Sequence, residues 1–124
     1  MTPRETVEQF VSHWNSGDFE AMFAMCADEI IWHNIPMEPI EGLAAMRGAI
    51  DGFMEPVERC EWEIHSIAEN GNSVLTERTD AFQLKSGKRA ELPVMGTFEL
   101  NDQGKITQWR DYFDMGQFQS EFAG

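Results

Sequence analysis

The amino-acid sequence predicts an α+β fold in which helices cover one face of a curved β-sheet. Apolar residues recur at helical spacing in the first part of the chain, and from Glu58 onward they alternate with polar residues as in strands. Short clusters of turn-forming residues separate the later strands, which is typical of an antiparallel meander. With one strand inserted between two helices, this is an α+β order, and the covered face of such a sheet becomes a pocket.

Three helices are expected in the first half of the sequence. The first begins at a capping box formed by Thr2 and Glu5, with a proline at the first helical position, and its apolar stripe ends near Asn15. A short second helix at residues 19–26 presents one apolar face. A third is expected at residues 43–54, where helical spacing returns after a proline-rich loop.

Five strands are expected. The segment at residues 29–35 changes to a period of two between the second and third helices. Alternating patterns then predict strands at residues 58–68, 73–84, 89–100 and 105–113. Because the loops between the last three are short, these strands should pair in antiparallel order.

Composition excludes several classes of protein. The 124 residues carry a formal net charge of −13, which repels nucleic acid and anionic membranes, and no apolar run approaches the roughly eighteen residues of a membrane span. Cys26 and Cys60 form no metal-binding motif and are too few for a disulfide scaffold, so reduced core thiols are expected. Residues 1–124 are expected to form a single domain, and the absence of a leader pattern predicts a cytoplasmic location.

Three charged residues fall on strand faces that are otherwise apolar. Alternation along residues 73–84 directs Arg78 and Asp80 inward, and alternation along residues 105–113 directs Asp111 inward. Pairing about the two turns is predicted to set Val94, on the strand between them, opposite both aspartates. Their Cα atoms would then lie roughly 10 Å apart.

The three charged side chains are expected to form one hydrogen-bonded network. Leaving a buried charge unpaired costs about 3 to 5 kcal/mol, so Arg78 is expected to bridge both carboxylates with its rigid fork of donors. Two carboxyl groups in unequal surroundings titrate apart, which provides one general base and one general acid. The alternative, that the inward arginine and aspartate only fix the strand register, stays open.

The strand at residues 29–35 adds a second inward set. Trp32 and Asn34 share a face opposite His33, and an asparagine beside an indole N–H can hold a water molecule. Tyr112 alternates to the face opposite Asp111 and is expected to serve packing or an interface. The predicted pocket wall consists of Met46, Phe82, Leu92, Val94, Phe98, Trp109 and Phe113.

Three stretches of the chain resemble the limonene-1,2-epoxide hydrolases. They are the run from Thr76 to Asp80, the strand from Leu92 to Phe98, and the run from Lys105 to Phe113, and the likeness covers nearly the whole chain. The resemblance implies a cone-shaped, curved mixed sheet with N-terminal helices packed in its concave face, which is the cystatin-like fold of the nuclear-transport-factor-2-like (SnoaL-like) superfamily. It also implies a homodimer formed through the outer sheet surface.

The same resemblance assigns roles to the inward residues. Asp111 matches the general base that removes a proton from water, Asp80 matches the acid that protonates the epoxide oxygen, and Arg78 matches the arginine that links them. Asn34 matches an asparagine that helps to hold the water. The chain departs from the family at Trp32, where the family has tyrosine, and an indole N–H donates a hydrogen bond but cannot accept one.

The function expected on these grounds is the one-step addition of water to a small, mostly apolar epoxide, terpene-like or cyclic, giving a vicinal diol without metal or organic cofactor. A ketosteroid-isomerase-like or polyketide-cyclase-like enzyme of the same fold is the alternative. It ranks lower because such a site needs an oxyanion donor and the one tyrosine, Tyr112, is predicted to point outward. A non-catalytic domain that binds a small ligand is a third possibility, because a fold does not fix a function.

Overall fold

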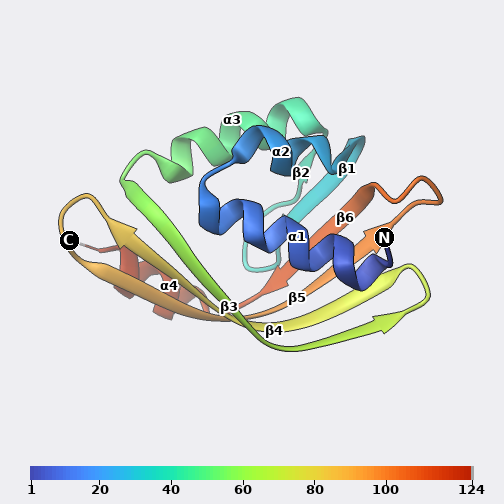
Figure 1. Ribbon diagram of the computed structural model, residues 1–124. Coiled ribbons are helices and arrows are strands. Elements are labelled where there is room, and N and C mark those ends of the chain that lie inside the picture. Colours follow the sequence, from blue (N-terminus) through green and yellow to red (C-terminus); the bar gives the residue numbers. More distant parts are fainter. Residues whose placement is uncertain (124) are drawn as a thin grey trace.

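Six strands form one mixed sheet that curls around the helices (Figure 1). The computed structural model describes residues 1–123. The elements in chain order are α1 (Pro3–Ser16), α2 (Phe19–Ala24), β1 (Cys26–Asn34), β2 (Ile40–Glu41), α3 (Leu43–Met54), β3 (Val57–Asn70), β4 (Ser73–Leu84), β5 (Arg89–Leu100), β6 (Ile106–Tyr112) and α4 (Met115–Phe122). The strand order is β2-β1-β6-β5-β4-β3, with β1 parallel to β6 and the other pairs antiparallel, which confirms the expected α+β class.

Helix α1 crosses the concave side of the sheet (Figure 1). Its predicted capping box is present, because the Thr2 hydroxyl accepts the backbone N–H of Glu5 at 3.1 Å and the Glu5 carboxylate accepts that of Thr2 at 2.9 Å. Gly17 ends the helix at φ 77°, a conformation that glycine adopts without strain. The buried side of α1 packs on the sheet, where the Phe10 and Trp109 rings meet edge to face with centroids 5.1 Å apart.

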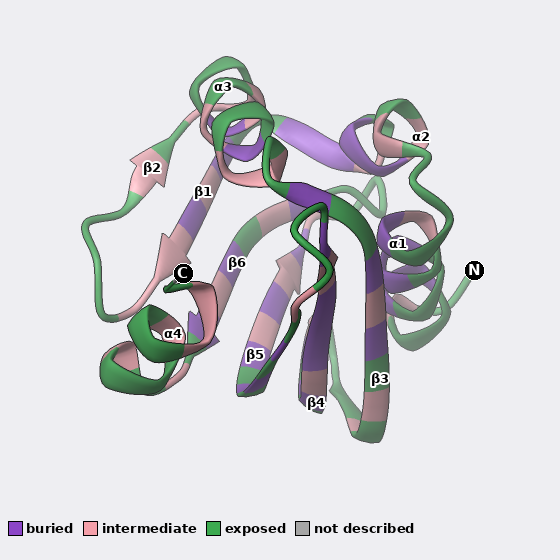
Figure 2. Cartoon of the chain, turned by 90° about the vertical axis from the view of Figure 1, so that its left-hand side faces the viewer, coloured by how far each residue is buried: buried purple, intermediate pink, exposed green. Residues whose placement is uncertain are grey.

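Burial alternates along the central strands, as Figure 2 shows. The even-numbered residues of β4 and β5 are buried against the helices, whereas most odd-numbered residues are exposed or half-buried. This period of two is the pattern on which the inward placement of Arg78, Asp80 and Asp111 was predicted. All three side chains are buried, so that placement is confirmed.

The predicted register between β4 and β5 is wrong by two residues. Asp80 pairs with Leu92 rather than with Val94. The reason is the connecting turn, which has three residues (85–87) instead of the expected five. Gly87 makes the shorter turn possible because it adopts φ 98°, in the left-handed region. A shift of two residues preserves which face each side chain occupies.

The predicted register between β5 and β6 is wrong by the same amount. Asp111 pairs with Gly96 and not with Val94. One residue of the shift comes from the turn, which closes between Asn101 and Lys105 and so has three residues instead of the expected four, and the other comes from an irregularity between Glu99 and Leu100. The two aspartates are therefore not level across the sheet. Each is displaced by two residues from the level of Val94, in opposite directions along the sheet.

Several element boundaries, and two short elements, also differ from the sequence prediction. The second helix ends at Ala24, and Cys26 begins β1 because it pairs with Ile106 of β6. The short strand β2 and the helix α4 were not predicted. Each is short, and α4 buries none of its residues completely. Across residues 1–123, no helix has the length and apolar character needed to cross a membrane.

Candidate active site

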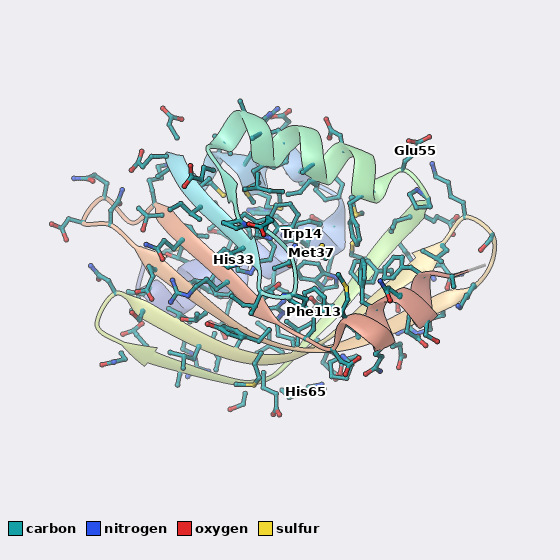
Figure 3. The ribbon with its side chains drawn as sticks, turned by 180° about the vertical axis from the view of Figure 1, so that it is seen from behind. Trp14, His33, Met37, Glu55, His65 and Phe113 are labelled. Carbon is teal, nitrogen blue, oxygen red and sulfur yellow. The ribbon has the colours of Figure 1, made fainter. Side chains whose placement is uncertain are left out.

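A cavity of about 230 Å³ lies between the helices and the inner face of the sheet. Half of the residues that line it are aromatic, and they come from α1, α3, α4, four strands and the segment after β6; the polar side chains in the lining are Asn34, Asp80 and Asp111. Figure 3 shows Trp14, Met37 and Phe113, which line the cavity, on the inner side of the sheet, whereas His65 lies on its outer side. The site is therefore an apolar chamber with a small, concentrated polar part.

Five of the seven residues predicted to form the pocket wall line this cavity. They are Phe82, Leu92, Val94, Trp109 and Phe113. The prediction for Met46 and Phe98 is wrong, because neither lines the cavity and both are fully buried in the hydrophobic core. Phe98 lies two residues beyond Gly96 along β5, where its ring packs edge to face with Phe10 of α1, with centroids 5.7 Å apart.

Several wall residues were missed in the sequence analysis. Trp14 and Phe53 lie near the ends of α1 and α3, and both belong to apolar stripes that could have identified them. Trp62 alternates with charged residues along its strand, but it was not assigned to the pocket. Phe118 could not be found in this way because its helix, α4, was not predicted.

Arg78 joins the two aspartates in one buried network. Its Nε and Nη2 donate to the two carboxylate oxygens of Asp80 at 3.0 and 2.8 Å. Its Nη2 and Nη1 donate to the two oxygens of Asp111 at 2.9 and 3.3 Å. The three residues are only 1%, 3% and 4% exposed, so these charge-assisted bonds are sheltered from solvent. The guanidinium also lies 5.2 Å from the ring centroid of Trp62, a favourable cation–π distance.

The surroundings shift the protonation of this network. Burial raises the pKa of Asp80 from 3.8 to about 6, even though the Arg78 guanidinium acts in the opposite direction, and the negative charge of Asp111 adds to the increase. Burial alone would lower the pKa of Arg78, but the carboxylates of Asp111 and Asp80 outweigh it and raise that pKa. Arg78 therefore stays charged while Asp80 can carry a proton near neutral pH.

Asp111 has additional neighbours that Asp80 lacks. The Trp109 indole Nε1 donates to Asp111 Oδ1 at 2.8 Å. Asn34 pairs with Asp111 in the parallel ladder between β1 and β6, so the amide and the carboxylate lie side by side at the cavity wall. The two carboxyl groups therefore have unequal surroundings, which is the condition for one to act as base and the other as acid.

Trp32 lies beside this polar part of the cavity. It is buried, and its ring stacks on that of Trp109 with centroids 5.6 Å apart. Its Nε1 finds no hydrogen-bond acceptor among residues 1–123. An indole N–H without an acceptor can donate to a bound molecule.

The cavity wall formed by residues 1–123 contains no histidine and no tyrosine. His33 Nε2 lies 3.0 Å from the carbonyl oxygen of Met37, and His65 Nε2 lies 2.8 Å from the Thr79 hydroxyl, so these two rings have other partners. Tyr112 is 48% exposed and does not line the cavity, as its alternation predicted. Within residues 1–123 no group of three His, Cys, Asp or Glu side chains is placed to hold a metal ion.

A curled mixed sheet with helices in its hollow is the fold of the NTF2-like and SnoaL-like proteins. The chain superposes on an NTF2-like protein of unknown function from Burkholderia pseudomallei K96243 with a TM-score of 0.87 at 15% identity, over 100% of both chains. It also superposes on the epoxide hydrolase/cyclase-like enzyme SalBIII with a TM-score of 0.83 at 20% identity, over 93% of this chain and 92% of that chain. At these identities the comparisons establish the fold alone.

Sequence comparisons define the family more narrowly. The family model of the limonene-1,2-epoxide hydrolase catalytic domain matches residues 1–123. The chain is 37% identical over 116 residues to epoxide hydrolase EphG of Mycobacterium tuberculosis (strain ATCC 25618 / H37Rv), covering 88% of this chain and 71% of that protein. It also matches the structure of an M. tuberculosis LEH-like epoxide hydrolase with a TM-score of 0.82 at 33% identity, over 98% of this chain and 90% of that chain. The chain therefore belongs to the limonene-1,2-epoxide hydrolase family, and by this membership it is an enzyme of the epoxide hydrolase class.

Proposed function

We propose that this protein adds water to a small, mostly apolar epoxide in one step and releases a vicinal diol. The observation that carries the proposal is the buried network of Asp80, Arg78 and Asp111 at the wall of an apolar cavity. Both carboxyl groups line the cavity, while the arginine that joins them does not. A substrate can thus touch both acids at once.

The two aspartates act in opposite senses in this mechanism. Asp111 accepts a proton from water while the water oxygen attacks an epoxide carbon, and Asp80 donates its proton to the epoxide oxygen as the carbon–oxygen bond breaks. Each positioned proton transfer contributes about a hundredfold to ten-thousandfold. No covalent intermediate forms, because water itself attacks the carbon, and afterwards Asp111 gives up its proton and Asp80 takes one back. Arg78 keeps its charge throughout and holds the two groups in place.

Trp32 and Asn34 are proposed to hold the attacking water. Asn34 lies beside Asp111, and the Trp32 Nε1–H lacks an acceptor within residues 1–123. The indole would donate to the water oxygen, while the Asn34 carbonyl oxygen and the Asp111 carboxylate accept the two water protons. In this arrangement the Trp32 indole stands where the family has a tyrosine, and it donates a hydrogen bond to the water without accepting one.

The substrate is proposed to be a terpene-like or cyclic epoxide with few polar groups. The support is the wall, which is apolar over most of its extent and offers polar side chains only around Asp80 and Asp111. Burying apolar surface contributes about 25 cal/mol per Å², so ring carbons are held well here, whereas a charged substituent would lose its hydration without compensation.

Isotope labelling tests the one-step mechanism. Enzyme in excess is mixed with a panel of cyclic and aryl epoxides in ¹⁸O-water, and the diol of a single turnover is analysed by mass spectrometry. We expect the label in the diol from the first turnover. A label that enters only on the second turnover would demonstrate a covalent ester and reject the proposal. Failure to open any epoxide, with tight binding of the same compounds, would favour a ligand-binding domain instead.

The outer face of the sheet is proposed to form a homodimer. Leu75, Met95 and Tyr112 are 44%, 49% and 48% exposed, and Met95 pairs with Tyr112 in the β5–β6 ladder, so apolar side chains adjoin on this face. Light scattering on the purified protein should give twice the chain mass. Met95→Glu together with Tyr112→Glu should give the monomer mass, and a wild-type protein that is monomeric at micromolar concentration would contradict the dimer.

A cytoplasmic location is also proposed. Cys26 and Cys60 are free and buried, and burial raises the pKa of each thiol to about 12, which keeps both in the unreactive thiol form. Neither thiol depends on an oxidising compartment. Fractionation of the native cells, with the protein recovered outside the cytoplasmic fraction, would reject this location.

A further inference from the structure

The Arg78 guanidinium has five N–H groups, and the two aspartates accept four of them. The fifth goes to Thr76, whose hydroxyl oxygen accepts from Nη1 at 3.0 Å. Thr76 is 1% exposed and in turn donates its own proton to the carbonyl oxygen of Gly96 at 3.1 Å. Because a hydroxyl has a single proton, this bond leaves only lone pairs facing Nη1, so Thr76 serves the arginine purely as an acceptor.

Gly96 lies in the same row across the sheet. Thr76 of β4 pairs with Gly96 of β5, Gly96 pairs with Asp111 of β6, and Asp111 pairs with Asn34 of β1. A Cβ atom at Gly96 would come closer than 3.0 Å to both Asp111 Oδ1 and Arg78 Nη1, a separation that Cβ atoms essentially never show. The guanidinium therefore occupies the space that a side chain at this position would fill.

This row explains how Arg78 reaches both aspartates. Arg78 pairs with Val94 of β5. Two residues from Val94 in one direction, Leu92 pairs with Asp80, and two residues in the other direction, Gly96 pairs with Asp111. The guanidinium must pass over β5 to reach Asp111 on the far side. The Nη1–Asp111 contact, at 3.3 Å, is the longest of its bonds to the aspartates, and the same nitrogen also donates to Thr76 at 3.0 Å.

We propose that Thr76 and Gly96 are positioning residues that hold the guanidinium between the two carboxylates, Thr76 by accepting the N–H that neither aspartate takes and Gly96 by leaving room above β5. This inference rests on the proposed epoxide hydrolysis. Neither residue lines the cavity, so neither touches the substrate. Their influence passes through Arg78 to the geometry of the proton transfers and leaves substrate binding unchanged.

Thr76→Val removes the acceptor and keeps the shape of the side chain. One buried N–H of a charged group then loses its partner, and the guanidinium moves to recover it. We expect kcat to fall about tenfold to hundredfold while KM stays within about twofold. Thr76→Ser restores the hydroxyl and should return kcat to within about threefold of the wild type.

Thr107 offers a matched control. Its hydroxyl also donates to a carbonyl oxygen of β5, that of Glu99, at 3.1 Å, but it does not contact Arg78. Thr107→Val should therefore leave kcat and the pH profile unchanged. Gly96→Ala should lower kcat at least as much as Thr76→Val does. Circular dichroism and thermal melting test whether each variant is folded at the assay temperature. A folded Thr76→Val with full kcat, or a folded Thr76→Ser without recovery, would overturn the proposal.

A measurement without substrate separates this inference from the proposed function. Carbon-13 NMR of the aspartate carboxyl carbons follows the titration of the network in the wild type and in each variant. We expect the titration midpoint of Asp80 to move in Thr76→Val and to return in Thr76→Ser. If no epoxide is turned over but this pattern holds, the hydrolase assignment fails and the positioning role stands. If the midpoints are the same in all three proteins, the positioning role fails whatever the activity.

Discussion

Arg78 is the residue on which both aspartates depend. It is fully buried, and it is the one cation in hydrogen-bonding contact with either carboxyl group among residues 1–123. An isolated buried carboxylate would take up a proton, and two carboxylates without a cation between them would repel each other. The guanidinium allows one carboxyl group to stay ionised next to a second that can be protonated. The proposed division of labour between Asp111 and Asp80 therefore begins with the arginine.

Asp111→Asn tests the base. The amide keeps the shape of the carboxyl group but cannot accept a proton from water, so we expect kcat to fall about a thousandfold, within the range of a lost proton transfer. Far-ultraviolet circular dichroism should match the wild type. Steady-state kinetics on the best epoxide of the panel gives the measurement, and a variant that keeps more than a tenth of the activity would exclude Asp111 as the base.

The pH dependence tests the acid. Burial raises the pKa of Asp80 to about 6, and an acid must be protonated to act, so kcat should fall as the pH rises through about 6. The free energy of unfolding should also fall as the pH rises. A carboxyl group whose pKa is higher in the folded than in the unfolded protein stabilises the fold below pH 3.8, and this contribution is lost as the pH rises toward 6.

Asp80→Asn removes the titrating group and separates this effect from other carboxylates. Urea unfolding of both proteins at pH 4.5, 5.5 and 6.5 gives the free energies of unfolding. We expect the wild type to lose stability relative to Asp80→Asn across this interval. A difference that does not change with pH would show that Asp80 titrates normally, and the assignment of the acid would then fail.

At the level of secondary-structure elements, the alternation of polar and apolar residues predicts which face of the sheet a side chain occupies. It does not predict which residues pair across neighbouring strands. Arg78, Asp80 and Asp111 were placed inward from a period of two, and the two-residue errors in register left this placement intact. The level of each residue along its strand depends on two three-residue turns and on an irregularity next to Leu100, and no alternation pattern contains this information. The proposed role of Thr76 and Gly96 could not be predicted for the same reason. It depends on the pairing of Thr76, Gly96 and Asp111 across three neighbouring strands.

Helix α4 shows a second limit of sequence reasoning. It is short, contains Gly116, and is held by contacts with distant parts of the chain, including Lys88 Nζ bonds to the carbonyl oxygens of Ser120 and Ala123 at 3.2 and 3.0 Å. Short helices depend on such packing more than on local propensity. Only the assembled fold shows that α4 contributes Phe118 to the cavity wall.

Phe118→Ala tests that contribution. The ring lies against Phe53 with centroids 6.1 Å apart and lines the cavity, but it is only half-buried. Its loss removes apolar contact with the substrate and leaves the acids untouched, so KM should rise about tenfold with kcat within about threefold. Thermal melting should change by only a few degrees. An equal fall in kcat with KM unchanged would place Phe118 in the proton-transfer machinery instead.

At the level of the whole molecule, the acidic surplus and the active site are separate electrostatic systems. The net charge of −13 arises mainly from exposed carboxylates, whereas the charges of the network are buried and largely neutralise one another. Repulsion among exposed like charges opposes the compact state, and salt screens it over a Debye length of about 10 Å at 0.1 M. Buried pairs are screened much less.

The melting temperature should therefore rise by a few degrees between about 0.01 and 0.5 M sodium chloride, while kcat/KM for an uncharged epoxide changes by less than about twofold. Differential scanning calorimetry and initial rates over the same salt series give both quantities. Glu29 and Glu38 are exposed and form no ion pair within residues 1–123, so Glu29→Lys with Glu38→Lys reduces the surplus at little structural cost. This double variant should melt higher than the wild type at low salt and respond less to added salt. A melting temperature that falls with salt, or a rate that follows the salt series, would show that the surface charge and the buried network act as one system.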